Sequence, residues 1–170
     1  MEQKALRKLG IEAIVCPMIF DDARLPVSFK PSKNPHVYMT AHPGREKEYG
    51  IDKIRKIADL FPNIIFHIYG LFPNPYLVGT PQDKNIMYHG LTNEDRFNME
   101  ISDYHAAIRL NKFDGFAETL AKSALMGQFP ISWIPYPHIT HVHDASSLRK
   151  ALEGLSKKKE PNYEARKYWS

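Results

Sequence analysis

The chain has 170 residues, of which 43% are hydrophobic and 25% are charged, a composition that fits one ordinary water-soluble domain. No stretch approaches the roughly 20 consecutive apolar residues that a membrane span needs, which excludes a transmembrane protein. The amino terminus carries charge but no apolar segment after it, so a secretory signal is not expected and the sequence predicts a cytoplasmic protein. The single cysteine, Cys16, excludes an internal disulfide and a cysteine-based zinc finger.

The net charge of +4 comes from the carboxyl-terminal end of the chain. Residues 145–170 contain seven Lys and Arg against three Asp and Glu, whereas the other 144 residues contain sixteen of each sign. A domain that reads nucleic acid spreads basic residues along its docking face, so no nucleic-acid partner is expected. The basic tail around Lys157, Lys158 and Lys159 is interpreted as a solvated face, or as a peripheral membrane contact through anionic lipid.

Strand-like and helix-like segments alternate along most of the chain. Apolar, β-rich runs predict strands at 36–41, 64–70, 85–90, 104–110 and 129–135. Helical spacing and capping residues predict helices at 51–58, from a Thr92 cap to 99 or 101, at 116–126 ending at Gly127, and at 145–155 capped by Asp144 or Ser146. This alternation predicts an α/β fold, a Rossmann-like three-layer α/β/α domain with a mainly parallel sheet.

The predicted domain occupies residues 35–160. Residues 1–34 do not follow the alternation and are interpreted as an interdomain connection or lead-in, and residues 161–170 as a carboxyl-terminal helical tail. Ligands of such sheets bind outside the carboxyl ends of the strands. We therefore expect a site among the segments that follow the strands, at 42–50, 70–82, 90–93, 111–118 and 135–138.

The most informative of these segments lies within residues 109–132. A strand ends at Leu110, a turn with Gly115 follows, and a helix starts near Phe116. The first amides of a helix lack internal partners and carry the positive end of its dipole, which suits a phosphate, and a glycine lets the ligand approach the backbone. The alternative is an ordinary strand-to-helix turn.

This segment resembles the donor-site signature of the group 1, family 4 glycosyltransferases of GT-B fold. The resemblance rests on DGFA at 114–117, ALMG at 124–127 and PI at 130–131, in that order. The strand, basic loop and helix of 36–70 and the run NIMYHG at 85–90 resemble the same family, and LGIEAIVCP at 9–17 resembles its interdomain connection. The resemblance covers about residues 36–155.

The resemblance implies one half of a GT-B fold that binds a nucleoside-diphosphate sugar, UDP- or GDP-linked. It implies the donor half of a retaining glycosyltransferase of glycan biosynthesis, which transfers a hexosyl group to a glycan or lipid-linked acceptor without a metal or another cofactor. The acceptor half has no counterpart in this sequence, so an N-terminal acceptor domain would be missing from this chain.

The resemblance also assigns site residues. Asp114, the candidate catalytic residue, stands where the family usually has a Glu that helps position donor groups, and Gly115, Phe116 and Ala117 complete the donor-binding turn. Lys122 stands eight positions later, where the family usually has a ribose-binding Glu.

A neighbouring acid and a histidine extend this predicted site. Glu118, one turn before position 122, is a candidate substitute for the ribose-binding carboxylate. His89 lies where the family recognises the base or the distal part of the donor, with a packed histidine as the alternative.

Three basic residues are candidate phosphate ligands or structural charges. Arg45 and Lys47, in the loop PGREKEYG, occupy the place where the family grips the donor pyrophosphate, the alternative being a solvated charged loop. Arg109 is costly to bury unpaired, so we expect it to pair with Asp114 or Asp103, with a ligand contact as the alternative.

The remaining histidines are not read as a metal site. His138, His141 and His143 lie close together in sequence, but no thiol accompanies them, and His67 is interpreted as a satisfied core side chain. Two other functions remain open from sequence alone. One is a non-catalytic nucleotide-binding or interaction domain, a degenerate transferase, and the other is a sugar-nucleotide epimerase of GT-B fold.

Overall fold

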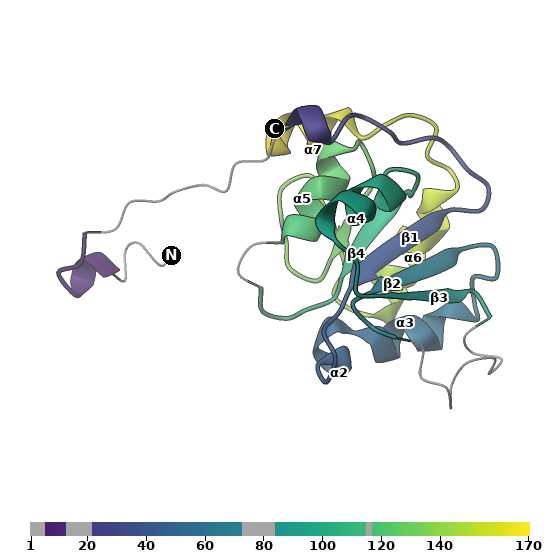
Figure 1. Cartoon of the computed structure of the whole chain (residues 1–170), viewed down its shortest axis with the longest axis horizontal. Helices are drawn as coiled ribbons and strands as arrows, with labels where there is room; N and C mark the ends of the chain where they lie inside the picture. The colour runs from purple at the N-terminus through teal and green to yellow at the C-terminus, as the bar shows by residue number, and fades with distance from the viewer. Residues whose placement is uncertain (1–5, 13–21, 73–83, 115–116) are drawn as a thin grey trace.

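A six-stranded parallel sheet forms the centre of the molecule (Figure 1). The computed structural model describes residues 6–12, 22–72, 84–114 and 117–170, and within them the strand order is β3-β2-β1-β4-β5-β6 with every neighbouring pair parallel. The strands are β1 (His36–Thr40), β2 (Ile65–Tyr69), β3 (Ile86–Gly90), β4 (Ala106–Arg109), β5 (Ile131–Ser132) and β6 (Thr140–His141). The predicted Rossmann-like α/β fold is confirmed.

Helices connect and cover these strands. They are η1 (Asp22–Arg24), α2 (Glu46–Tyr49), α3 (Ile51–Ala58), α4 (Glu94–Ile101), α5 (Glu118–Leu125), α6 (Ala145–Leu155) and α7 (Tyr163–Trp169). Asn93 caps α4 by accepting from the backbone N–H of Arg96, so the prediction of Thr92 as the cap was wrong by one residue. Asp144 caps α6 in a capping box with Ser147, which confirms one of the two predicted caps.

Helices cover both faces of the sheet (Figure 1), and buried hydrophobic side chains of the described residues form a cluster on each face. Met39 of β1 points to one face and packs with Ile54 of α3 and Leu152 of α6. Tyr38 points to the other face and packs with Leu120 of α5. Successive strand residues point to opposite faces, so a strand that is buried on both sides reads as a continuous apolar run.

The segments before and after the predicted domain also contribute to the second cluster. Leu25 precedes β1 and Ala165 belongs to α7, and both are buried there. The Arg166 guanidinium donates to the backbone oxygens of Leu25 and Leu125, which ties α7 to α5 and to the chain before β1. The domain boundaries at residues 34 and 160 stay predictions. No helix in the described part of the chain has the length and apolar character of a membrane span.

The carboxyl ends of β1, β2 and β3 lie close together around Gly70. The backbone N–H of Ala41 donates to the Tyr69 oxygen at 2.9 Å, and the N–H of Gly70 donates to the Gly90 oxygen at 2.7 Å. Gly70 has a φ of +87°, and a Cβ added there would lie 2.1 Å from the backbone oxygen of Ala41. Only glycine fits this position, because it has neither the backbone penalty nor the clash.

We expect Gly70→Ala to lower the free energy of unfolding by about 2–5 kcal/mol, the combined cost of a left-handed backbone and of overpacking. Gly44→Ala is the matched control, because Gly44 has a φ of +81° but nothing within 4 Å of the added Cβ. It should cost only about 1–2 kcal/mol, the backbone term alone. Urea unfolding monitored by circular dichroism measures both losses, and equal losses would contradict this account.

Candidate functional site

A cleft of about 460 Å³ opens at the carboxyl ends of β1, β2 and β4. It lies between α4 and α5, and its lining residues are Thr40, Ala41, Tyr69, Gly70, Leu91, Thr92, Asn93, Glu94, Phe97, Arg109, Glu118, Thr119 and Lys122. β1 and β4 are neighbours in the sheet, but the chain continues from β1 to β2 on one side and from β4 to β5 on the other. This is the switch point at which ligands bind in open parallel sheets.

The first turn of α5 forms one wall of the cleft. Ala117 is the N-cap residue and is buried, and none of the described side chains caps this helix end. Thr119 lines the cleft, and its Oγ1 lies 3.3 Å from the Oγ1 of Thr40 at the end of β1. The start of α5 therefore presents backbone amides and hydroxyl groups toward the cleft, a combination that suits an anion.

Lys122 joins the two helices that flank the cleft. Its side chain is 5% exposed, and its Nζ lies 2.9 Å from Oε1 of Glu94 on α4 and 2.8 Å from Oε1 of Glu118 on α5. Burial alone would lower the pKa of Lys122, but the hydrogen bonds with Glu118 and Glu94 outweigh burial and raise it. Position 122 therefore holds a permanently charged ammonium group that is already paired with two carboxylates.

Arg109 projects from the carboxyl end of β4 into the cleft. Its Nη2 donates to Oδ1 of Asp114 at 3.1 Å, its Nε donates to Oδ2 of the same carboxylate, and its Nη1 donates to the Thr40 hydroxyl at 3.2 Å. The Tyr49 ring centroid lies 5.3 Å from its guanidinium carbon. The predicted pairing of Arg109 with an acid is confirmed, with Asp114 as the partner.

The other predicted phosphate ligands lie outside the cleft lining. Arg45 precedes α2, and its Nε donates to the Glu48 carboxylate at 2.8 Å, with 57% of the Arg45 side chain exposed. Lys47 belongs to a second pocket of about 440 Å³, which Leu71 and Phe72 also line. The loop that contains both basic residues folds into the short helix α2. The Arg45 side chain there points to solvent and pairs with Glu48.

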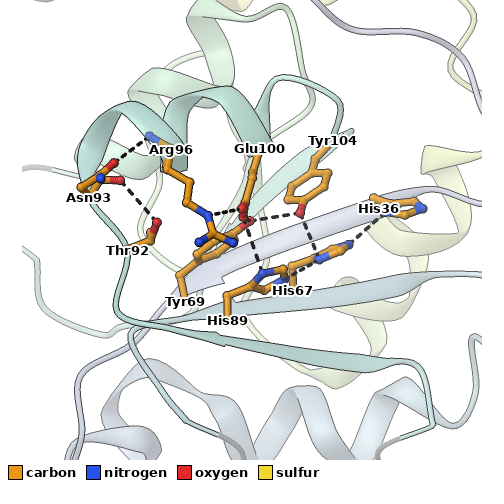
Figure 2. A network of polar contacts seen from close by, with 9 residues as sticks. All are labelled: His36, His67, Tyr69, His89, Thr92, Asn93, Arg96, Glu100 and Tyr104. Carbon is orange, nitrogen blue, oxygen red and sulfur yellow. Dashed lines mark hydrogen bonds and ion pairs between the residues drawn. The ribbon is translucent and has the colours of Figure 1, made fainter.

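His89 belongs to a partly buried polar network behind one wall of the cleft (Figure 2). Its Nε2 lies 2.8 Å from Nδ1 of His67, and Nε2 of His67 lies 2.9 Å from Nδ1 of His36. The three histidines come from neighbouring strands, β3, β2 and β1. The interpretation of His67 as a satisfied core side chain is confirmed.

Tyrosines connect this histidine row to the cleft (Figure 2). The Tyr104 hydroxyl lies 3.1 Å from Nδ1 of His67 and 3.0 Å from the Tyr69 hydroxyl. The Tyr69 hydroxyl donates to Glu100 at 2.6 Å, and Arg96 donates to the same carboxylate at 2.7 Å. Tyr69 lines the cleft, so the network fixes the position of one cleft wall.

The structure thus brings together part of the predicted site. Glu118 and Lys122 line the cleft. Asp114 does not line it but accepts from Arg109, which does, and Ala117 is the N-cap of the helix in its wall. The predictions for Gly115 and Phe116 lie outside the described residues.

The lining residues Thr92 and Asn93 lie in the expected segment 90–93, whereas sequence reasoning missed Thr40, Glu94 and Thr119. Their position at the end of a strand or at the start of a helix is the signal that could have found them.

No family model and no curated protein matches the sequence. Among solved structures, the pneumococcal O-GlcNAc transferase GtfA, in complex with UDP and GlcNAc, matches with a TM-score of 0.60 and 16% identity over 85% of this chain and 34% of that chain. The C-terminal domain of the group 1 glycosyl transferase LpcC from Francisella tularensis matches with a TM-score of 0.59 and 9% identity over 86% of this chain and 90% of that chain.

The catalytic domain of cholesterol-alpha-glucosyltransferase from Helicobacter pylori matches with a TM-score of 0.61 and 11% identity, over 80% of this chain and 97% of that chain. The chain has the fold of a GT-B glycosyltransferase domain. The fold that the motifs at 114–131 implied is therefore confirmed. The chain spans about a third of the length of GtfA, so it corresponds in fold to one part of that enzyme.

The buried histidines make stability depend on pH. Burial, followed by the nearby His36 and His89, lowers the pKa of His67 from 6.5 to about 3, and burial also lowers the pKa of His36, His89 and His105. Below pH 6.5 the unfolded chain takes up protons that the folded chain does not, so stability falls as the pH falls. Through His67 alone, the free energy of unfolding should drop by about 2 kcal/mol between pH 7 and pH 5.

Urea unfolding at a series of pH values measures this dependence. His67→Gln should flatten the dependence of the free energy of unfolding on pH between pH 7 and pH 5, because the imidazole with the lowered pKa is removed. His143→Gln is the control, since that side chain is 69% exposed and lies outside the network, and it should keep the slope of the wild type. A slope that is the same in all three proteins would rule out His67 as its source.

Proposed function

We propose that the cleft binds a nucleoside-diphosphate sugar and that the chain is the donor-binding half of a retaining glycosyltransferase. The observation that carries the proposal is the position of the cleft at the β1/β4 switch point, with the start of α5, which none of the described side chains caps, in its wall. A phosphate group of a diphosphate suits such a helix start, because the backbone amides and the helix dipole favour an anion. The presence of UDP and GlcNAc in the GtfA complex, which shares the fold, supports the same ligand class.

The chemistry of this proposal is electrostatic. As the bond between the sugar and the diphosphate breaks, negative charge accumulates on the leaving phosphate oxygens, and fixed cations and helix amides stabilise it. Arg109 and the start of α5 would supply both kinds of group without rearrangement, because each is already held in place. No step needs a metal or another cofactor in this proposal.

The acceptor belongs to a part of the enzyme that this chain does not contain. In the proposal, a glycan or lipid-linked acceptor binds an N-terminal domain, and transfer occurs between the two domains. Alignment of the acceptor hydroxyl with the sugar contributes about 7–11 kcal/mol to lowering such a barrier. The chain alone should therefore bind the donor without transferring its sugar.

A second function is favoured by the charges at position 122. Where the family has a single ribose-binding Glu, this chain has three charged side chains, those of Lys122, Glu94 and Glu118. Such a site suits a nucleotide-binding domain that has lost its transferase activity. The two functions differ in whether the chain supports transfer when an acceptor domain is supplied.

Calorimetric titration with UDP-glucose, UDP-GlcNAc and GDP-mannose tests donor binding by the chain. We expect at least one to bind with a Kd near the micromolar to millimolar range, and Leu91→Trp to weaken that binding by filling the cleft. Leu91 is 75% exposed, so the substitution should leave the fold intact. Leu60→Trp is the control, since Leu60 is 58% exposed and lines a different groove.

A transfer assay with labelled donors and a glycan or lipid extract completes the test. The chain alone should form no product. The absence of binding by every donor would contradict the proposal, and equal weakening by both tryptophan variants would contradict the placement in this cleft.

A further inference from the structure

Arg109 and Lys122 are the cations among the side chains that line the cleft. Lys122 has two carboxylates within 2.9 Å of its Nζ, so the local charge around its ammonium group is negative overall. Arg109 has one carboxylate partner, Asp114, and the hydroxyl of Thr40. Fewer carboxylates therefore compete with an approaching anion for Arg109 than for Lys122.

The guanidinium of Arg109 keeps part of its donor capacity for a ligand. An arginine side chain has five N–H groups, and Asp114 and Thr40 accept from three of them. Among the described residues no further hydrogen-bond acceptor contacts the remaining N–H groups on Nη1 and Nη2. Each of these two nitrogens therefore keeps one N–H that a phosphate oxygen could accept from.

The orientation of Arg109 is fixed before any ligand arrives. The Asp114 carboxylate holds the Nε and Nη2 edge, Thr40 of β1 holds Nη1, and the Tyr49 ring lies against the guanidinium. The Arg109 side chain is 15% exposed and that of Asp114 is 10% exposed. A cation held in this way loses little conformational entropy on binding, because few rotamers remain to be lost.

We propose that Arg109 is the residue that binds the phosphates of the donor, and that Asp114 is a positioning residue that holds Arg109 rather than a catalytic residue. The inference rests on the proposed function and names the phosphate ligand within it. Arg109, at the end of β4, thereby takes the phosphate-binding role that the sequence predicted for Arg45. Arg45 is largely exposed, contacts Glu48, and does not line the cleft.

The test compares a nucleoside diphosphate with its nucleoside. Calorimetric titration of the whole chain with UDP and uridine, or with GDP and guanosine, separates phosphate contacts from base and ribose contacts. Arg109→Lys should weaken diphosphate binding by at least about tenfold, because lysine keeps the charge but loses the paired donors. Nucleoside affinity should stay unchanged. Arg45→Ala should leave both affinities unchanged.

Asp114 is tested as a positioning residue. Asp114→Asn should weaken diphosphate binding and leave nucleoside binding unchanged, and Asp114→Glu should recover part of the loss because it restores a carboxylate. Thr40→Val removes the hydroxyl that accepts from Nη1 and that also lies 3.3 Å from the Thr119 hydroxyl, and it should give a smaller loss of the same kind. This milder variant keeps the test decisive if a substitution at Arg109 or Asp114 unfolds the chain.

The outcomes separate the two proposals. If the wild-type chain binds neither diphosphate, the proposed function fails. If the wild type binds but Arg109→Lys and Thr40→Val keep full diphosphate affinity, the assignment of Arg109 is overturned while the proposed function stands. Loss of diphosphate affinity in Arg45→Ala alone would show that the phosphates bind at Arg45, next to α2, and not at Arg109.

Discussion

β1 pairs in parallel with β2 on one side and with β4 on the other. From β1 the chain continues outward to β2 and β3, and from β4 it continues outward to β5 and β6 on the opposite side. Crossovers between parallel strands are right-handed, so a reversal of direction places the connecting helices on opposite faces. The core clusters show this, since α3 packs on one face and α5 on the other. Neither helix covers the carboxyl ends of β1 and β4, and the cleft follows from that arrangement.

The polar groups around the cleft are held by partners from distant parts of the chain. Lys122 links α4 to α5, Arg109 links β4 to the end of β1, and Glu100 of α4 holds Tyr69 of β2. Buried polar groups are costly unless paired, so each of these contacts favours one arrangement of the cleft wall. The Rossmann-like fold positions the cleft, and these pairs fix which groups a ligand meets.

Much of the fold could be predicted from local signals, because apolar periodicity and caps such as Asp144 act within a few residues. β5 and β6 have two residues each, too few to give a pattern, and the predicted strand at 129–135 was therefore too long. The site depends on contacts between residues far apart in sequence. The charge of Lys122 is visible in the sequence, but its pairing with Glu94 is not. The sequence likewise does not show that Arg45, just before α2, is exposed and pairs with Glu48.

The central claim is that a nucleoside diphosphate binds at the β1/β4 switch point. Titration of the ¹⁵N-labelled chain with UDP and with GDP, followed by backbone amide NMR, tests it most directly because it locates the ligand without a substitution. The account predicts that the largest shift changes fall on Thr40, Asn93, Glu118 and Thr119, which line the cleft. Changes centred instead on the pocket of Lys47 and Phe72, or no changes at millimolar nucleotide, would contradict the account.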